Sequence, residues 1–251
     1  MTMSVYNLIS QYILIIGSIV ALVFLAVAGN EKRAATGLTR QNWKSAVLIV
    51  LAFVGIYIVR TVVSVAVQGV SDGSGMQHVK EWAAMFKNPM MWLNIAALPI
   101  NYFFVFIAFF GEEYGWRYYL QPVLQKRFGL RAGVIILGVV WGLWHIPDDL
   151  FYYTQTSGIQ MIFAQQITCI SLGIFFAYAY MKTQNIWVPV CLHYLNNNLI
   201  PIISGTFSAD VLENQTVSWK DLPVALVLNG LCFGFFLLAD VFKKKEVQEE
   251  E

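Results

Sequence analysis

Three short clusters of polar residues have the types and spacing that hydrolytic chemistry requires. The clusters are Glu112-Glu113-Tyr114-Gly115-Trp116-Arg117, Trp141-Gly142-Leu143-Trp144-His145 and His193-Tyr194-Leu195-Asn196-Asn197. Each contains two side chains four residues apart, which places both on one face of a helix. These pairs are Glu113 with Arg117, Trp141 with His145, and His193 with Asn197. The adjacent Glu112 and Glu113 point about 100° apart on a helix, so one can face a reaction centre while Arg117 holds the other.

A carboxylate, two imidazoles and an amide are the groups needed to add water to an amide bond. Glutamate takes a proton from the attacking water, and a histidine polarises the carbonyl or protonates the leaving amine. Asn197 donates to the developing oxyanion. The sequence contains no HExxH, which argues against a zinc protease of the soluble type. The clusters therefore favour hydrolysis by activated water.

The three clusters are predicted to lie at similar depth in a membrane. On each helix we count from the polar residue to the basic residue near the helix end: Glu112 to Lys126, His145 to Arg131, and His193 to Lys182. The separations are about 14, 14 and 11 residues, or roughly 21, 21 and 17 Å at the rise of an α-helix. Any one of these polar groups is also typical of packing between membrane helices. Their coincidence at one depth favours a shared site, because ionisable groups inside lipid are costly.

The composition predicts the elements that position these clusters. The chain has 251 residues, of which 58% are hydrophobic and only 12% charged, whereas soluble domains average roughly 25% charged residues. This balance excludes a soluble globular domain and a disordered chain. The net charge of +1 gives no reason to expect a nucleic-acid partner. The three cysteines form no metal or disulfide pattern.

Seven apolar runs are long enough to cross a bilayer. They are Leu8–Ala28, Ser45–Val67, Met90–Phe110, Ala132–Phe151, Met161–Met181, Ile186–Ser204 and Leu222–Phe242. The first is read as an uncleaved span. Arg60, in the second run, is either an intramembrane charge or a residue that snorkels outward. We expect an all-α, polytopic integral membrane helical bundle of seven helices, or eight with a further or re-entrant piece near Met76 to Leu93. Residues 1–251 are expected to form a single membrane domain.

The distribution of basic residues predicts the orientation. Segments after the first, third, fifth and seventh runs contain twelve lysines and arginines, whereas the N-terminus and the other segments contain three. Basic residues gather on the cytoplasmic side of membrane proteins. We therefore expect an N-terminus outside and a cytoplasmic C-terminus.

The ordered motifs E-E-x-x-x-R, [F/W]-x-x-x-H and H-x-x-x-N on successive helices resemble those of the CAAX prenyl protease and bacteriocin-processing (CPBP, or Abi) family of intramembrane proteases. The resemblance covers residues 101–201 as a catalytic core, and the flanking contexts look like those of its bacterial branch. It implies a multi-pass protein of the bacterial cell membrane that acts as an endopeptidase with a site open to the cytosol. Eukaryotic members remove the last three residues of prenylated proteins. Bacterial members would process bacteriocin or signalling-peptide precursors, or serve self-immunity.

The resemblance leaves two hydrolytic mechanisms open. In one, Glu112 is the water-activating base, Glu113 is its support held by Arg117, and their roles are open to exchange. His145, His193 and Asn197 complete the catalytic set, and Trp141 gives structural support. In the other, Glu112, His145 and His193 hold zinc through one oxygen and two nitrogens.

The substrate is predicted to be a peptide or a membrane-anchored protein at the lipid bilayer. The main alternative is a catalytically idle scaffold or regulator, for instance of a sensor kinase, that uses the same fold. A proton-coupled transporter is less favoured, because the sequence shows neither inverted repeats nor paired broken helices. Intact acid and imidazole positions favour an enzyme.

Overall fold

A computed structural model describes residues 15–16, 18–23, 26–27, 38, 41–204 and 215–243. Most of the predicted span Leu8–Ala28 lies outside them. The α-helices are α3 (Trp43–Asp72), α4 (Gly75–Lys87), α5 (Pro89–Glu113), α6 (Gln121–Phe128), α7 (Leu130–Trp144), α8 (Ile146–Phe151), α9 (Gly158–Thr183), α10 (Trp187–Ser204) and α12 (Asp221–Cys232). The π-helix η1 (Tyr114–Leu120) joins α5 to α6, and two 3₁₀ segments, η2 (Gly234–Leu238) and η3 (Asp240–Phe242), follow α12. Every regular element of the described residues is helical, as predicted.

Four of the described helical stretches are long and apolar enough to cross a membrane. They are Trp43–Val70, Pro89–Phe128, Leu130–Phe151 and Gly158–Thr183, and each exceeds the roughly 20 residues that a bilayer core requires. The prediction of a multi-pass helical membrane protein is confirmed to this extent. The count of seven or eight spans and the orientation of the termini stay predictions.

In two stretches the structure differs from the single membrane span or re-entrant piece that the sequence predicts. The run from Leu222 to Phe242 is not one long helix, because α12 ends at Cys232 and the chain tightens into 3₁₀ turns from Gly234. Twelve α-helical residues rise only about 18 Å. The stretch Met76–Leu93 contains the 13-residue helix α4 and the start of α5. Asn88 separates them by capping α5, because its side chain accepts a hydrogen bond from the N–H of Met90 at 3.0 Å.

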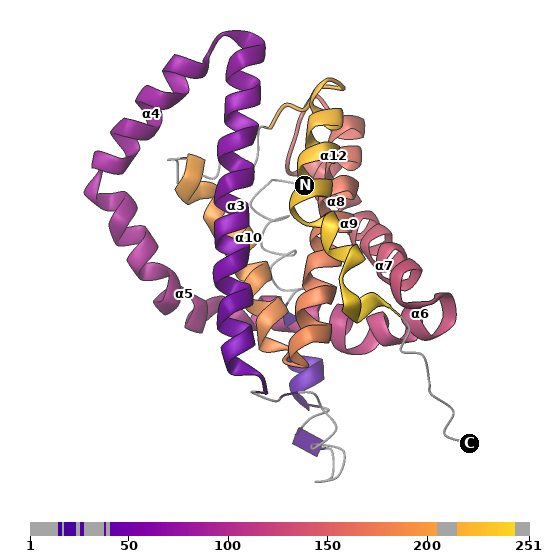
Figure 1. The fold of residues 1–251 in the computed structure, drawn as a ribbon. Coiled ribbons are helices and arrows are strands. Elements are labelled where there is room, and N and C mark those ends of the chain that lie inside the picture. The colour runs from indigo at the N-terminus through magenta and orange to yellow at the C-terminus, as the bar shows by residue number, and fades with distance from the viewer. Residues whose placement is uncertain are drawn as a thin grey trace.

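Helix α9 is the centre of the bundle, with α3, α7, α10 and α12 against it (Figure 1). Its contact with α7 is close because glycines of α7 face it. A Cβ added to Gly138 would lie 2.6 Å from the Cα of Ile170, and one on Gly142 would lie 2.6 Å from the Gln166 side chain. Small residues let membrane helices approach closely. This packing fixes Trp141, which lies between the two glycines.

Helices α5, η1 and α6 form one continuous helical stretch of 40 residues, Pro89–Phe128. The helix that bears Glu112 and Glu113 therefore continues as far as its basic residues Lys126 and Arg127. Helix α10 packs against α5. Two polar contacts tie them together: the Tyr194 hydroxyl donates to the carbonyl of Leu98 at 2.8 Å, and the Asn101 amide donates to the Tyr194 oxygen at 3.2 Å. This pairing places the residue before Tyr194, His193, beside the C-terminal end of α5.

Candidate active site

Three charged or ionisable side chains from two of the predicted motifs form a buried chain of contacts. Nη1 of Arg117 donates to Oε1 of Glu113 at 3.2 Å and lies 3.1 Å from Oε2. Oε1 of Glu113 also lies 2.8 Å from Nδ1 of His193, which comes from α10. Both Glu113 and Arg117 are fully buried, and His193 is 3% exposed. The structure thus contains the Glu113–Arg117 pair that the spacing predicts and joins it to the histidine of the third motif.

Arg117 is enclosed by aromatic rings. Its guanidinium carbon lies 4.7 Å from the ring centre of Trp141 and 5.1 Å from that of Phe176. Nε and Nη2 have no hydrogen-bond partner in the described part of the chain, so the ring faces take the place of further acceptors. A buried cation is tolerated when a carboxylate and aromatic faces compensate its lost hydration. Arg117 lies within the π-helix η1, a rare element that often marks functional sites.

His193 presents one ring nitrogen to the site. The carboxylate of Glu113 only accepts hydrogen bonds when ionised, so Nδ1 of His193 donates to it and Nε2 is left for another partner. The ring is held on two sides by aromatic residues, with ring centres 5.3 Å away at Trp141 and 5.1 Å away at Phe109. These contacts fix the orientation of the imidazole.

His145 lies at a break in the helix. Its backbone N–H bonds to the carbonyl of Gly142 at 3.1 Å, not to that of Trp141 as in an uninterrupted α-helix. Nδ1 of the same residue instead bonds to the Trp141 carbonyl at 2.9 Å. Because a carbonyl only accepts, Nδ1 carries the proton and the neutral ring keeps an acceptor at Nε2. Pro147, at the start of α8, lacks the N–H that would continue the helix.

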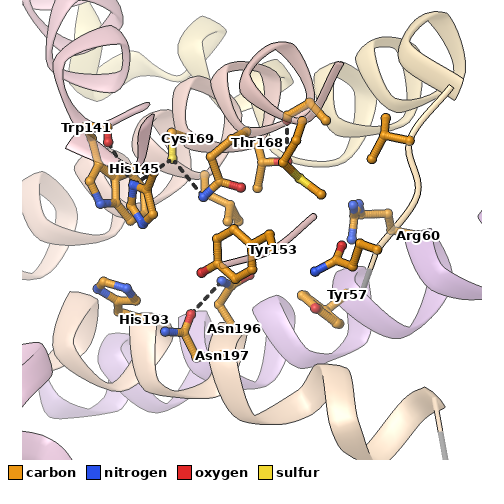
Figure 2. A pocket seen from close by; sticks show the side chains of 16 residues that line it. Tyr57, Arg60, Trp141, His145, Tyr153, Thr168, Cys169, His193, Asn196 and Asn197 are labelled. Atoms are coloured by element: carbon orange, nitrogen blue, oxygen red, sulfur yellow. Dashed lines mark hydrogen bonds between the residues drawn. The ribbon is translucent and has the colours of Figure 1, made fainter. Parts of the chain in front are cut away.

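A cavity of about 300 Å³ brings the second and third motifs together (Figure 2). Its lining includes Trp141, His145, His193 and Asn197. The part of the cavity that these four residues line is called the histidine end. Oδ1 of Asn197 accepts a hydrogen bond from the Asn196 amide at 3.0 Å. The amide nitrogen of Asn197 is therefore the group left to donate to a ligand. The volume is at the lower limit for small-molecule pockets, roughly 300 Å³.

Glu112 is placed differently from Glu113. It is half-buried and is not among the residues that line the cavity. Within the described residues its carboxylate has no hydrogen bond or ion pair, but its charge interacts electrostatically with His193, Arg117 and Cys169. Glu112 is therefore near the centre and has no such contact, whereas Glu113 is bonded to Arg117 and His193.

The donor arrangement does not fit a metal ion. No group of three His, Cys, Asp or Glu side chains within residues 41–204 and 215–243, or in the shorter described stretches, is placed to hold one. Nδ1 of His193 is already bonded to Glu113, and Glu112 is not among the described residues that line the cavity with His145 and His193. The described residues thus do not bring Glu112, His145 and His193, the set predicted for zinc, together as a metal-binding group.

Other residues that the motifs did not indicate line the cavity or lie near it. Arg60 of α3 lines the same cavity. Of the two alternatives for this residue, an intramembrane charge and a side chain that snorkels outward, the structure supports the first. Asp149 of α8 is fully buried, and neither carboxylate oxygen has a hydrogen-bond partner in the described chain. The sequence could have indicated Asp149 only as an acidic residue inside the predicted span Ala132–Phe151. Gln215 and Val217 also line the cavity, and their backbone N–H groups bond to Tyr153 and Ser157.

The fold and the site together define a multi-pass helical membrane protein with a buried Glu–His–Arg centre at a polar cavity. Residues 93–199 match the family model described as type II CAAX prenyl endopeptidase Rce1-like. This segment contains all three motifs. Over this segment the chain is similar to the CAAX protease family, the family that its motifs resemble.

A curated relative agrees with this assignment. The CAAX prenyl protease 2 of Methanococcus maripaludis is 27% identical over 125 residues, which cover 46% of this chain and 45% of the relative. The match thus spans less than half the length of that protein. No solved structure matches the chain.

Proposed function

We propose that this protein is an intramembrane endopeptidase that hydrolyses a peptide bond of a membrane-associated protein or peptide with water activated by glutamate and histidine. The observation that carries the proposal is the buried chain Arg117–Glu113–His193. It directs the second nitrogen of His193 to a cavity that His145 and Asn197 also line. A scaffold would gain nothing from burying these groups, which are costly inside a membrane.

Each polar residue has a separate role in this proposal. The Glu112 carboxylate takes a proton from water as the water oxygen bonds to the carbonyl carbon of the substrate. His145, with its acceptor at Nε2, orients that water. The amide of Asn197 and Nε2–H of a protonated His193 donate to the oxyanion. The C–N bond then breaks, the amine nitrogen receives the proton held by Glu112, and the products are a carboxylate and an amine.

Glu113 and Arg117 act through other residues. Glu113 is neutralised by Arg117 and bonded to His193, so its free lone pairs are fewer than those of Glu112. We therefore propose Glu113 as the group that orients His193, in the way that a carboxylate orients the histidine of other hydrolytic sites. Trp141 supports the arrangement by contact with Arg117, His145 and His193.

The substrate class follows from the family and the position of the site. The family model and the relative are both named for CAAX prenyl endopeptidases. We propose a peptide or protein held at the lipid bilayer by an anchor, which brings its scissile bond to the membrane-embedded helices.

The test is cleavage of a lipid-anchored fluorogenic peptide by the purified protein in detergent. Glu112→Gln, His145→Ala and His193→Ala are each expected to lower kcat/KM by at least about 100-fold, the usual contribution of general acid–base groups. His78→Ala is the matched control, because His78 bonds only to Ser74 and Glu81 on and beside α4, away from the cavity. Full cleavage by all three variants would overturn the protease proposal and leave the scaffold alternative.

The two glutamates are separated by a second readout. We expect Glu112→Gln to lower activity without lowering the melting temperature, and Glu113→Gln to lower both. The reverse pattern would exchange their roles. Metal analysis of the purified protein, with the same assay before and after treatment with a chelator, tests whether hydrolysis proceeds without zinc.

A further inference from the structure

The end of the cavity away from the histidines is cationic. Arg60 and Tyr57, both on α3, line this end of the cavity, opposite Trp141 and His145 (Figure 2). This end is called the arginine end. Arg60 lies inside the apolar stretch Trp43–Val70, ten residues from its nearer limit. Ten helical residues correspond to about 15 Å. The guanidinium therefore faces an internal cavity from within a membrane-spanning helix.

Arg60 has no carboxylate partner among the described residues. No Asp or Glu there lies within ion-pair distance of it, and its Nε is buried without a hydrogen bond. Its ring contact is with Tyr57, whose centre lies 5.7 Å from the guanidinium carbon. An intramembrane arginine without a counter-ion is costly, and such residues commonly mark substrate or ion pathways. The missing partner is therefore expected to come from a ligand.

The chemistry of the lining selects an anion. The lining residues that the structure describes include neither Asp nor Glu, so an anionic group beside Arg60 would meet no like charge among them. Tyr153, Gln165, Thr168 and Gln215 add neutral polar groups. A guanidinium presents paired N–H donors whose spacing matches the two oxygens of a carboxylate. A carboxylate in a peptide substrate is the ligand that best suits this end.

We propose that Arg60 binds the C-terminal carboxylate of the substrate and so determines where the chain is cut. This inference rests on the proposed endopeptidase function. The cavity of about 300 Å³ contains both ends, so it has room for only a few residues between the scissile bond and the bound carboxylate. The enzyme then releases a short peptide from the C-terminus. Arg60 lies outside residues 93–199, the segment that matches the family model.

The experiment compares three lipid-anchored peptides of the same sequence. One has a free C-terminal carboxylate, one a C-terminal carboxamide, and one a carboxamide with Asp as its last residue. The wild-type protein in dodecyl maltoside, a detergent without phosphate, is expected to favour the free acid in kcat/KM by about 10- to 100-fold, as one charge-assisted hydrogen-bonded pair would give. Equal rates for acid and amide would overturn the proposal. So would equal rates for the acid and the Asp peptide, which would indicate side-chain recognition.

Variants of Arg60 complete the test. Arg60→Gln should lose the preference for the acid, mainly through KM, and a melting temperature no lower than that of the wild type shows that the protein is folded. Arg60→Lys should retain part of the preference. Arg127→Gln is the control, because Arg127 is exposed on α6 and is not a lining residue. An Arg60→Gln protein that loses both rates equally, or keeps the wild-type preference, would contradict the assignment.

Binding measurements separate this proposal from the proposed function. Wild-type protein should bind a fluorescent, non-cleavable acid peptide more tightly than its amide, and Arg60→Gln should bind both alike. This result supports the role of Arg60 even if no peptide is cleaved, in which case only the protease proposal fails. A preference for the acid that vanishes in phosphatidylcholine vesicles would assign the arginine end to a lipid phosphate and overturn the proposal.

Discussion

Arg117 and Arg60 both lie within apolar helical stretches, but their surroundings differ. Arg117 is fully buried, bonded to Glu113 and enclosed by Trp141 and Phe176. Arg60 is half-buried, contacts a single aromatic ring and has no carboxylate partner in the described chain. The histidine end of the cavity is thus complete before a ligand arrives, whereas the arginine end has a charge still to be neutralised. The difference fits the proposed division of the cavity into an end for hydrolysis and an end for recognition.

The largest effect is expected from Arg117→Met. This change leaves the buried carboxylate of Glu113 without its cation, and breaking a buried ion pair in this way costs about 3–5 kcal/mol. A loss of that size lowers the melting temperature of a chain of this length by roughly 10 °C. Thermal unfolding in detergent measures it. Adding Glu113→Gln to Arg117→Met should restore part of the loss, and an Arg117→Met protein with wild-type stability would contradict the pairing.

A change of activity without a change of stability is expected from Asn197→Ala. Asn197 is exposed to the cavity, and its amide contacts only Asn196 among the described residues. Loss of one oxyanion donor commonly lowers kcat by about 10²- to 10³-fold. Single-turnover cleavage of the anchored peptide measures the chemical step. Asn198→Ala is the control, because that amide bonds to the backbone carbonyl of Tyr194 and does not line the cavity.

A smaller effect is expected from Gly138→Ala on α7. The new methyl group would meet the backbone of Ile170 at 2.6 Å, so α7 and α9 must move apart. Overpacking of this kind costs about 1–3 kcal/mol, and it displaces Trp141 and His145 together. The melting temperature and the cleavage rate should both fall.

Gly230→Ala is the matched control for Gly138→Ala. Gly230 lies in α12 with no atom within 4 Å of an added Cβ. Alanine there should raise stability by up to about 1 kcal/mol, since it favours a helix more than glycine does. If both variants lost the same stability, the close packing of α7 on α9 would not be the reason for glycine at position 138.

The smallest effect on stability, and one of opposite sign, is expected from Arg60→Met. Removing a charge that has no carboxylate partner among the described residues leaves no buried carboxylate behind in the membrane-spanning helix. The melting temperature should stay the same or rise by a few degrees, while Arg117→Met lowers it. The two variants measured side by side test the comparison directly. A fall for Arg60→Met as large as that for Arg117→Met would show that Arg60 has a structural partner.

The sequence was sufficient for the parts of the site that depend on helical spacing. The pair Glu113 and Arg117 meets because the residues are four apart, and the break at His145 still leaves it beside Trp141. The spans near 43–72, 89–128, 130–151 and 158–183 followed from apolar runs long enough for a bilayer. The roles of Glu112 and Asn197 stay predictions.

Other features depend on contacts between segments distant in the sequence. The direction in which Arg60 points was open between snorkelling and an internal site, and only the packing of α3 beside α10 distinguishes them. The contact of Glu113 with His193 spans 80 residues and requires the approach of α10 to α5. The end of α12 at Cys232 was missed because hydropathy does not distinguish an α-helix from 3₁₀ turns of the same composition.

The π-helix Tyr114–Leu120 has a consequence for how relatives are compared with this chain. A π turn holds more residues than an α turn, so such segments commonly arise when one residue is inserted into an α-helix. Every position after Leu120 is therefore rotated by about 100° relative to an unbroken helix numbered from Pro89. An ungapped alignment with a relative that lacks the insertion would assign the residues of α6 to the wrong helical face. A one-residue gap within Tyr114–Leu120 would restore the correct register, and the relatives that need no such gap would be those that share this geometry around Arg117.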